Sequence, residues 1–231
     1  TAPAAGPCPD RGNHTGFCSA IRAASICPGQ ASLAQGFDAT QLCAYRRNMP
    51  YDAPDLAKLS LADIVGLVAA RKLPPVESWR PEHTGDSEMR IASDGKWYHQ
   101  GGEITRPAMV RAFSSLLRRD DDGSHWLVTP QQRLSVKVED APFVAVEMQS
   151  EGEGKSRSLA FRLNSDDLVV AGPGHIIELR DGLPYLHVRN GLWAKLARSV
   201  YYELAEIALA ESPDAPCVWS NGVAFGIGAP A

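Results

Sequence analysis

The sequence predicts an α+β protein made of two tandem, similar units of antiparallel strands plus a helix, preceded by a disordered N-terminal segment. Two stretches support this prediction: residues 89–117 and residues 176–204 both run as strand, Asp-Gly turn, strand and amphipathic helix. A modest number of identical residues at one constant offset accompanies this shared order of elements. The pattern indicates an internal duplication.

In the first stretch the turn is Asp94-Gly95, because both residue types tolerate the positive φ that tight hairpin turns require. Apolar and polar residues alternate before the turn, and the aromatic pair Trp97-Tyr98 favours a strand after it. Thr105 is a good N-cap for the helix that follows, and Pro107 suits its first turn. The apolar face of this helix comprises Met109, Val110, Phe113, Leu116 and Leu117.

The second stretch has Asp181-Gly182 as its turn, and Asn190-Gly191 is expected to end its outgoing strand. A longer helix is expected to follow at once. Its apolar face comprises Leu196, Val200, Leu204 and Ile207. If the two units match, Phe113 and Val200 should both be buried, and both Asp-Gly turns should lie at the surface.

Periodicity and turn residues predict the remaining elements. A helix should begin near Ser60, which resembles a capping box with Asp63, and should end before Pro74-Pro75. Further strands are expected over residues 125–129, 134–139, 143–148, 158–163, 168–171 and 175–179, with one or two more near the C-terminus.

These elements divide the chain into four segments. Residues 1–48 are either a disordered extension or an upstream region misassigned to the reading frame, and residues 49–88 are an N-terminal helix and an extended linker. Residues 89–150 form the first α+β unit, and residues 151–231 form the second unit with a C-terminal tail. Four of the five cysteines precede Met49, the first methionine. Because the segment before it has no periodic apolar face, burial cannot offset the entropy lost on ordering.

Composition argues against several classes of protein. The net charge of −4 gives no electrostatic reason to bind nucleic acid or an anionic membrane. No apolar run approaches the ~20 residues that span a bilayer. A single cysteine after residue 48, Cys217, is typical of a reduced compartment, so we expect a cytoplasmic protein. We expect no metal and no cofactor, because the cysteines near His14 lack the close pairs of a zinc site.

No catalytic motif is found. Gly154-Lys155-Ser156 resembles the end of a phosphate-binding P-loop, but Gln149 stands where that motif requires glycine. Asp120 and Asp122 imitate the start of a calcium loop whose later acidic ligand is missing. We therefore predict no catalytic residue.

Polar residues near the ends of the predicted elements remain as candidates for a ligand site, whose arginines could bind an anion between the two units. The alternative is ordinary strand-end pairing of Arg106 or Arg189 with Glu139 or Asp140. The seven candidates are Trp97, His99, Arg106, Thr129, Glu139, Asp140 and Arg189.

Several motifs occur in a fixed order, namely DGKWYH at 94–99, a helix start at Arg106, LVTP at 127–130, VEDAPF at 138–143 and PYLHVRNGL at 184–192. By these motifs the chain resembles the bacterial family called domain of unknown function 1285, over roughly residues 76–208. The resemblance implies two similar α+β units in a short cytosolic chain with a link to signalling, and it supplies no catalytic residues. In that family an acidic residue commonly follows the leucine of the last motif. Here Trp193 follows Leu192, so a site that used this acid is altered.

Three functional hypotheses follow. The first is a non-enzymatic regulatory or signalling module that binds a small ligand or a partner protein in the cleft between the units. The second is a hydrolase-type enzyme that uses His99 with Glu139 or Asp140 as acid and base groups within hydrogen-bond reach. The third is a structural protein-interaction scaffold with an exposed apolar patch. The sequence favours a protein that is not an enzyme. It fits the first and third hypotheses equally well. It gives no indication of the oligomeric state.

Overall fold

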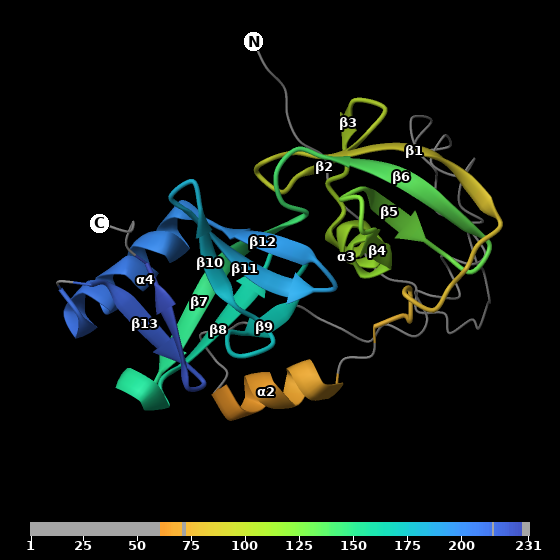
Figure 1. Ribbon diagram of the computed structural model, residues 1–231. Coiled ribbons are helices and arrows are strands. Elements are labelled where there is room, and N and C mark those ends of the chain that lie inside the picture. The colour runs from red at the N-terminus through yellow and green to blue at the C-terminus, as the bar shows by residue number, and fades with distance from the viewer. Residues whose placement is uncertain (1–60, 71–72, 214, 228–231) are drawn as a thin grey trace, which may run out of the picture.

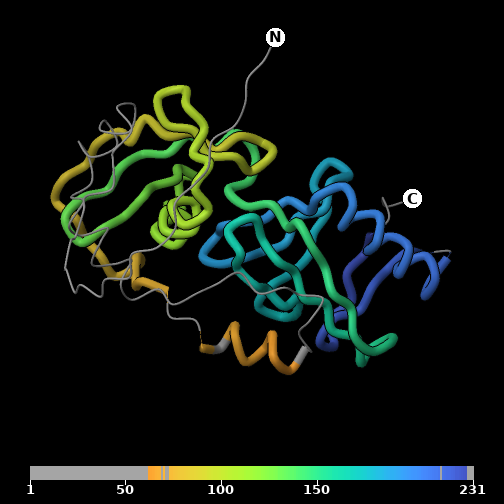
Figure 2. The backbone as a smooth tube through the Cα atoms, turned by 180° about the vertical axis from the view of Figure 1, so that it is seen from behind, coloured from red at the N-terminus to blue at the C-terminus, as the bar shows by residue number. Residues whose placement is uncertain are grey.

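The computed structural model describes residues 61–70, 73–213 and 215–227. In this part of the chain two six-stranded sheets form two domains that lie side by side (Figures 1 and 2). The α+β class and the presence of two similar tandem units are thereby confirmed. The expectation of disorder for residues 1–48 falls outside the described residues.

The first domain contains one helix and six strands. In chain order these are β1 (His83–Ile91), β2 (Trp97–His99), β3 (Gly102–Glu103), α3 (Pro107–Leu116), β4 (Leu117–Arg119), β5 (His125–Val128) and β6 (Gln132–Val138). The order across the sheet is β3-β2-β1-β6-β5-β4. β1 and β6 are parallel, whereas the other neighbouring strands are antiparallel. The sheet curves around α3, whose buried face includes Phe113 (Figure 1).

The second domain has the strands β7 (Phe143–Glu151), β8 (Ser158–Leu163), β9 (Leu168–Val170), β10 (Ile177–Arg180), β11 (Leu183–Arg189) and β12 (Leu192–Leu196), with a short 3-10 helix, η3 (Gly154–Ser156), between β7 and β8. The order across this sheet is β10-β11-β12-β7-β8-β9, and β7 runs parallel to β12. After the sheet come α4 (Arg198–Glu211) and a hairpin of β13 (Cys217–Ser220) and β14 (Val223–Gly226).

Both sheets follow one plan, in which two three-stranded meanders join through a central parallel pair formed by the first and last strands. In chain order β1 to β6 therefore correspond to β7 to β12. The helix lies between the meanders in the first domain and after them in the second. Residues 89–117 and 176–204, which share the order strand, turn, strand, helix, therefore do not occupy equivalent positions in the two sheets. The first stretch begins with the central strand β1, whereas the second begins with the edge strand β10.

Two expected element boundaries are wrong. The helix of the second unit does not follow Asn190-Gly191, because Leu192, Ala194 and Leu196 alternate with less buried neighbours and form β12. Leu117 was expected on the first helix and instead begins β4. In both cases a period-2 burial pattern competes with a helical one over a short apolar segment, and strand pairing determines the outcome.

The boundary between the domains also lies earlier than residue 150. β7 begins at Phe143 and pairs with β8 and β12, so residues 143–150 belong to the second domain. The link between the two sheets is therefore the short segment 139–142.

In the first Asp-Gly turn Asp94 is exposed, as expected, whereas Gly95 is buried at the domain junction. Asn164 donates a hydrogen bond from Nδ2 to the Gly95 carbonyl oxygen at 2.8 Å. Gly95 has φ +82°, and a Cβ there would lie 2.6 Å from Asn164 Nδ2 and 2.7 Å from Val144 Cγ2. Only glycine satisfies both the backbone conformation and this close approach.

Two arginines strengthen the same junction. Arg111 Nη1 lies 2.6 Å from Asp166 Oδ2. Arg189 donates from Nη2 to the Ser114 carbonyl oxygen at 2.6 Å, and its Nη1 lies 3.8 Å from Asp167 Oδ2. The turn between β8 and β9 therefore docks the second domain onto α3 of the first.

The helix α2 (Leu61–Ala70) precedes the first domain in the chain but packs on the second (Figures 1 and 2). Its fully buried Ile64 packs with Ala160 and Leu168. A separate and larger apolar core runs through both domains, with members from Val76 to Ile227. Within the described residues, none of the helices has the length and apolar character needed to span a bilayer.

The burial of α4 is directly testable. Val200 is 2% exposed in the core, whereas Leu209 on the same helix is 51% exposed. Val200→Asp places an unpaired charge in the core, so we expect it to lower the free energy of unfolding by about 3 kcal/mol or more. Leu209→Asp is the matched control and should change it by less than ~1 kcal/mol. Thermal unfolding followed by circular dichroism distinguishes the two, and a Val200→Asp protein as stable as its control would contradict this packing.

Candidate functional site

A cavity of about 620 Å³ opens between the two domains. The first domain contributes the end of β4 and the start of β5, and the second contributes the β10–β11 turn and parts of β11 and β12. The linker between the domains forms one wall. The lining residues are Arg119, Gly123, His125, Asp140, Ala141, Pro142, Arg180, Asp181, Leu183, Tyr185, Gly191 and Trp193.

Each domain supplies one guanidinium group to this interdomain cavity. Arg119, at the end of β4, is exposed and reaches across to Gly191, where a Cβ would stand 3.4 Å from Arg119 Nη1. Arg180, at the end of β10, lies 3.9 Å from the centroid of the Trp193 ring and pairs with Glu178. The aromatic ring orients the Arg180 guanidinium at the cavity wall through a cation–π contact.

The carboxylate of Asp140 is fully engaged on the same wall. Tyr185 donates its hydroxyl to Oδ1 at 2.7 Å, and Lys195 donates to Oδ2 at 2.6 Å. Burial alone would raise the pKa of Asp140, but the hydrogen bonds from Lys195 and Tyr185 outweigh it and lower the pKa. Burial, and then the bond to Asp140, raise the pKa of Tyr185 to about 12. At neutral pH the pair is therefore a charged acceptor and a protonated donor, which is a structural arrangement rather than an acid–base pair.

His125 is neutral at physiological pH. Burial lowers its pKa below the ordinary value of 6.5, and the nearby charge of Arg119 lowers it further. The cavity thus has two guanidinium groups, the exposed carboxylate of Asp181, an Asp140 neutralised by Lys195, and apolar surface from Pro142, Leu183 and Trp193. This combination can bind an anion that carries an apolar body.

Of the seven residues predicted from the sequence, Asp140 lines this cavity. Arg189 lies at the domain junction and Trp97 in the core, stacked on Phe113 with ring centroids 6.0 Å apart. The others lie at element ends of the first domain: His99 ends β2, Arg106 precedes α3, Thr129 closes the β5–β6 turn, and Glu139 follows β6.

The ion pairs also differ from those considered from the sequence. Glu139 accepts from Arg90 at 2.5 Å and from the Ser93 backbone N–H at 3.1 Å. Asp140 pairs with Lys195. Neither carboxylate is hydrogen-bonded to His99 in the described part of the chain, so the geometry does not support the hydrolase hypothesis.

Sequence reasoning missed Arg119, His125, Arg180 and Trp193 as members of one site. Only Trp193 had been noted, as the residue that replaces an acid in the last family motif. The two arginines stand beside Asp-rich or Asp-Gly turns, a position typical of solvated charge. The docking of the domains is what brings them to one cavity.

The fold is that of a two-domain α+β protein with a cavity at the domain junction. The chain belongs to the DUF1285 family: residues 74–141 match the model for its N-terminal domain, "Domain of unknown function (DUF1285)", and residues 142–227 match the model for its C-terminal domain. The boundary between these models falls in the linker between the sheets.

Two crystal structures of family members resemble this chain. A DUF1285 family protein from Silicibacter pomeroyi DSS-3 is 39% identical with a TM-score of 0.61, over 71% of this chain and 93% of that one. A DUF1285 family protein from Shewanella baltica OS155 is 28% identical with a TM-score of 0.44, over 51% of this chain and 90% of that one. No curated protein matches the chain.

The lowered pKa of His125 predicts a pH dependence of stability. In the folded protein the pKa of His125 lies below the unfolded value of 6.5, so the unfolded chain takes up a proton first as the pH falls. The free energy of unfolding therefore decreases as the pH falls from about 6.5 toward the folded pKa. We expect the free energy of unfolding to fall more steeply between about pH 7 and pH 5 in the wild type than in His125→Gln.

Urea unfolding across this pH range measures the difference. His83→Gln, at an exposed position, is the control and should follow the wild-type slope. If the free energy of unfolding changes with pH in the same way for the wild type and His125→Gln, then His125 has the same pKa in the folded and unfolded chain and the prediction is wrong.

Proposed function

We propose that the chain is a non-enzymatic regulatory or signalling module that binds a small anion with an apolar body in the interdomain cavity. The observation that supports this most strongly is the pair of guanidinium groups, Arg119 and Arg180, which come from different domains and line one cavity. Guanidinium groups bind carboxylates and phosphates through paired N–H donors. Pro142, Leu183 and Trp193 supply the apolar surface for the body of the ligand.

A ligand in this position contacts both domains at once. Its binding free energy therefore depends on their docked arrangement, and binding shifts the population toward that arrangement. A change in how the domains dock is the signal that such a module passes to a partner. The proposal places the protein in the cytoplasm, consistent with the free Cys217 of the described residues, and includes neither nucleic acid nor membrane as a partner.

The scaffold hypothesis finds less support. Two of the exposed large apolar side chains of the described residues, Tyr202 and Leu209, share α4, and the others lie on separate elements or loops: Val65, Leu73, Val146, Ile176 and Leu183. Scattered apolar side chains are normal on a soluble domain and do not by themselves mark a docking surface.

A thermal-shift screen of aromatic and aliphatic carboxylates tests the proposal. A ligand at about 100 times its Kd adds about 2.7 kcal/mol, which should raise the melting temperature by ~5 °C or more in a chain of this size. Calorimetric titration of the best carboxylate should then show at least a tenfold weaker affinity for Arg119→Gln and for Arg180→Gln, since each loses a charge-assisted hydrogen bond.

Arg198→Gln, at an exposed position at the start of α4, is the matched control and should bind as the wild type does. The proposal is wrong if no carboxylate stabilises the protein, or if all three variants bind with equal affinity.

A further inference from the structure

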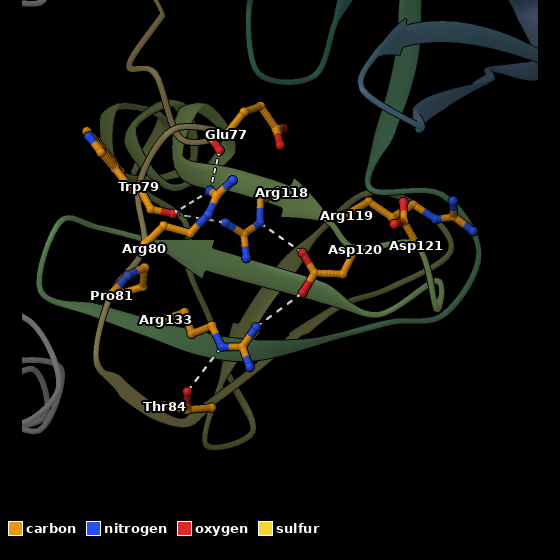
Figure 3. A pocket seen from close by; sticks show the side chains of 10 residues that line it. All are labelled: Glu77, Trp79, Arg80, Pro81, Thr84, Arg118, Arg119, Asp120, Asp121 and Arg133. Carbon is orange, nitrogen blue, oxygen red and sulfur yellow. Dashed lines mark hydrogen bonds and ion pairs between the residues drawn. The ribbon is translucent and has the colours of Figure 1, made fainter.

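A second cavity, of about 500 Å³, lies on the first domain and is separate from the site proposed above, although Arg119 lines both. Its walls come from the segment before β1, from the end of β4 and from β6. Three arginines dominate it: Arg80, Arg118 and Arg133 (Figure 3). We propose that this arginine cavity binds a phosphate group that carries two negative charges.

One carbonyl and one carboxylate hold the three guanidinium groups in a row. Arg80 Nη1 and Arg118 Nη1 both donate to the Trp79 carbonyl oxygen, at 3.0 and 3.5 Å. Arg118 Nε lies 2.9 Å from Asp120 Oδ1, and Arg133 Nη1 lies 3.3 Å from Asp120 Oδ2 (Figure 3). Arg118 and Arg133 thus share one carboxylate, and Arg80 is joined to Arg118 through the Trp79 carbonyl oxygen.

The other acids of the cavity, Glu77 and Asp121, offset part of this charge, and the lining as a whole holds four arginines against three carboxylates, a net charge of +1. The carboxylate of Glu77 accepts a hydrogen bond from Asn190 of the second domain at 2.9 Å. Asp121 lies beside Arg119, on the side of Asp120 that faces away from Arg80 (Figure 3). The row formed by Arg80, Arg118 and Arg133 therefore keeps a net positive charge, and like charges held close together favour an anion between them.

The row also has unused hydrogen-bond donors. Arg80 donates from Nη1 to backbone oxygens, and Arg118 and Arg133 each donate from Nε and Nη1. Among the described residues, the Nη2 group of none of the three makes a hydrogen bond. Each Nη2 carries two N–H groups, so donors remain for the oxygens of a ligand.

The guanidinium groups are held in place before any ligand arrives. The Arg118 side chain is 10% exposed. Arg133 lies 4.5 Å from the centroid of the Trp126 ring, and its Nε donates to Thr84 Oγ1 at 3.0 Å. Because these contacts fix the donors, little side-chain entropy is lost on binding.

The chemistry of the row indicates the class of ligand. A phosphate monoester or inorganic phosphate offers several acceptor oxygens on one tetrahedral centre, which suits the N–H donors that Arg80, Arg118 and Arg133 present from three directions in a cavity of net positive charge. A single carboxylate offers only a planar pair of oxygens, which can accept from fewer of these donors.

Inorganic phosphate is the probe, with phenyl phosphate to represent a monoester and chloride at equal ionic strength as the reference. Phosphate should raise the melting temperature above that in chloride. Calorimetry should show at least tenfold weaker binding for Arg80→Gln, which removes an exposed guanidinium at little risk to folding. Arg106→Gln, an exposed arginine of the same domain outside the cavity, should bind as the wild type does.

Arg180→Gln separates this inference from the proposed function, because Arg180 lines only the interdomain cavity. It should keep wild-type affinity for phosphate. The inference is overturned if phosphate acts no differently from chloride, if Arg80→Gln and Arg106→Gln bind alike, or if Arg180→Gln loses phosphate binding. A preference for phenyl phosphate over inorganic phosphate would support a monoester, and the reverse order would support the free ion.

Discussion

The contact of Arg189 with the first domain is the interaction on which the arrangement of this protein depends. Its guanidinium is 16% exposed and lies between the carbonyl of Ser114 on α3 and the Asp167 carboxylate, which is 3% exposed. A buried carboxylate is costly unless a cation accompanies it. Arg189 therefore couples the stability of the β8–β9 turn to the docking of α3, and the interdomain cavity exists only while the two domains are docked.

The docking also explains why local sequence signals located the elements better than the site. The two Asp-Gly turns, the apolar face around Phe113 and most strands could be predicted from residue types a few positions apart. β12 could not, because Leu192, Ala194 and Leu196 fit a short helix as well as a strand until pairing with β7 and β11 is known. The parallel pairing of the first and last strand in each sheet joins residues that are far apart in sequence, beyond the reach of any local pattern.

The same reasoning applies to the functional residues. Asp140 was predictable as a polar residue at the end of a strand, and it does line the interdomain cavity. Arg119 and Arg180 belong to different domains, so nothing local relates them. The three arginines of the second cavity are likewise dispersed, with Arg80 before β1, Arg118 in β4 and Arg133 in β6, and only the sheet order places β4 and β6 on either side of β5. Arg119 lines both cavities.

The claim that Arg189 docks the two domains is tested most directly by calorimetric melting of Arg189→Gln beside Arg180→Gln. Arg189→Gln removes the ion pair with the buried Asp167 carboxylate and the hydrogen bond to the Ser114 carbonyl oxygen. This should lower the free energy of unfolding by about 2 kcal/mol or more and the melting temperature by ~4 °C or more. Arg180→Gln changes an exposed arginine whose ion pair and ring contacts lie within the second domain, and it should melt within ~1 °C of the wild type. If Arg189→Gln melts at the same temperature as Arg180→Gln, in one unchanged transition, docking does not depend on Arg189 and the account of the domain junction is wrong.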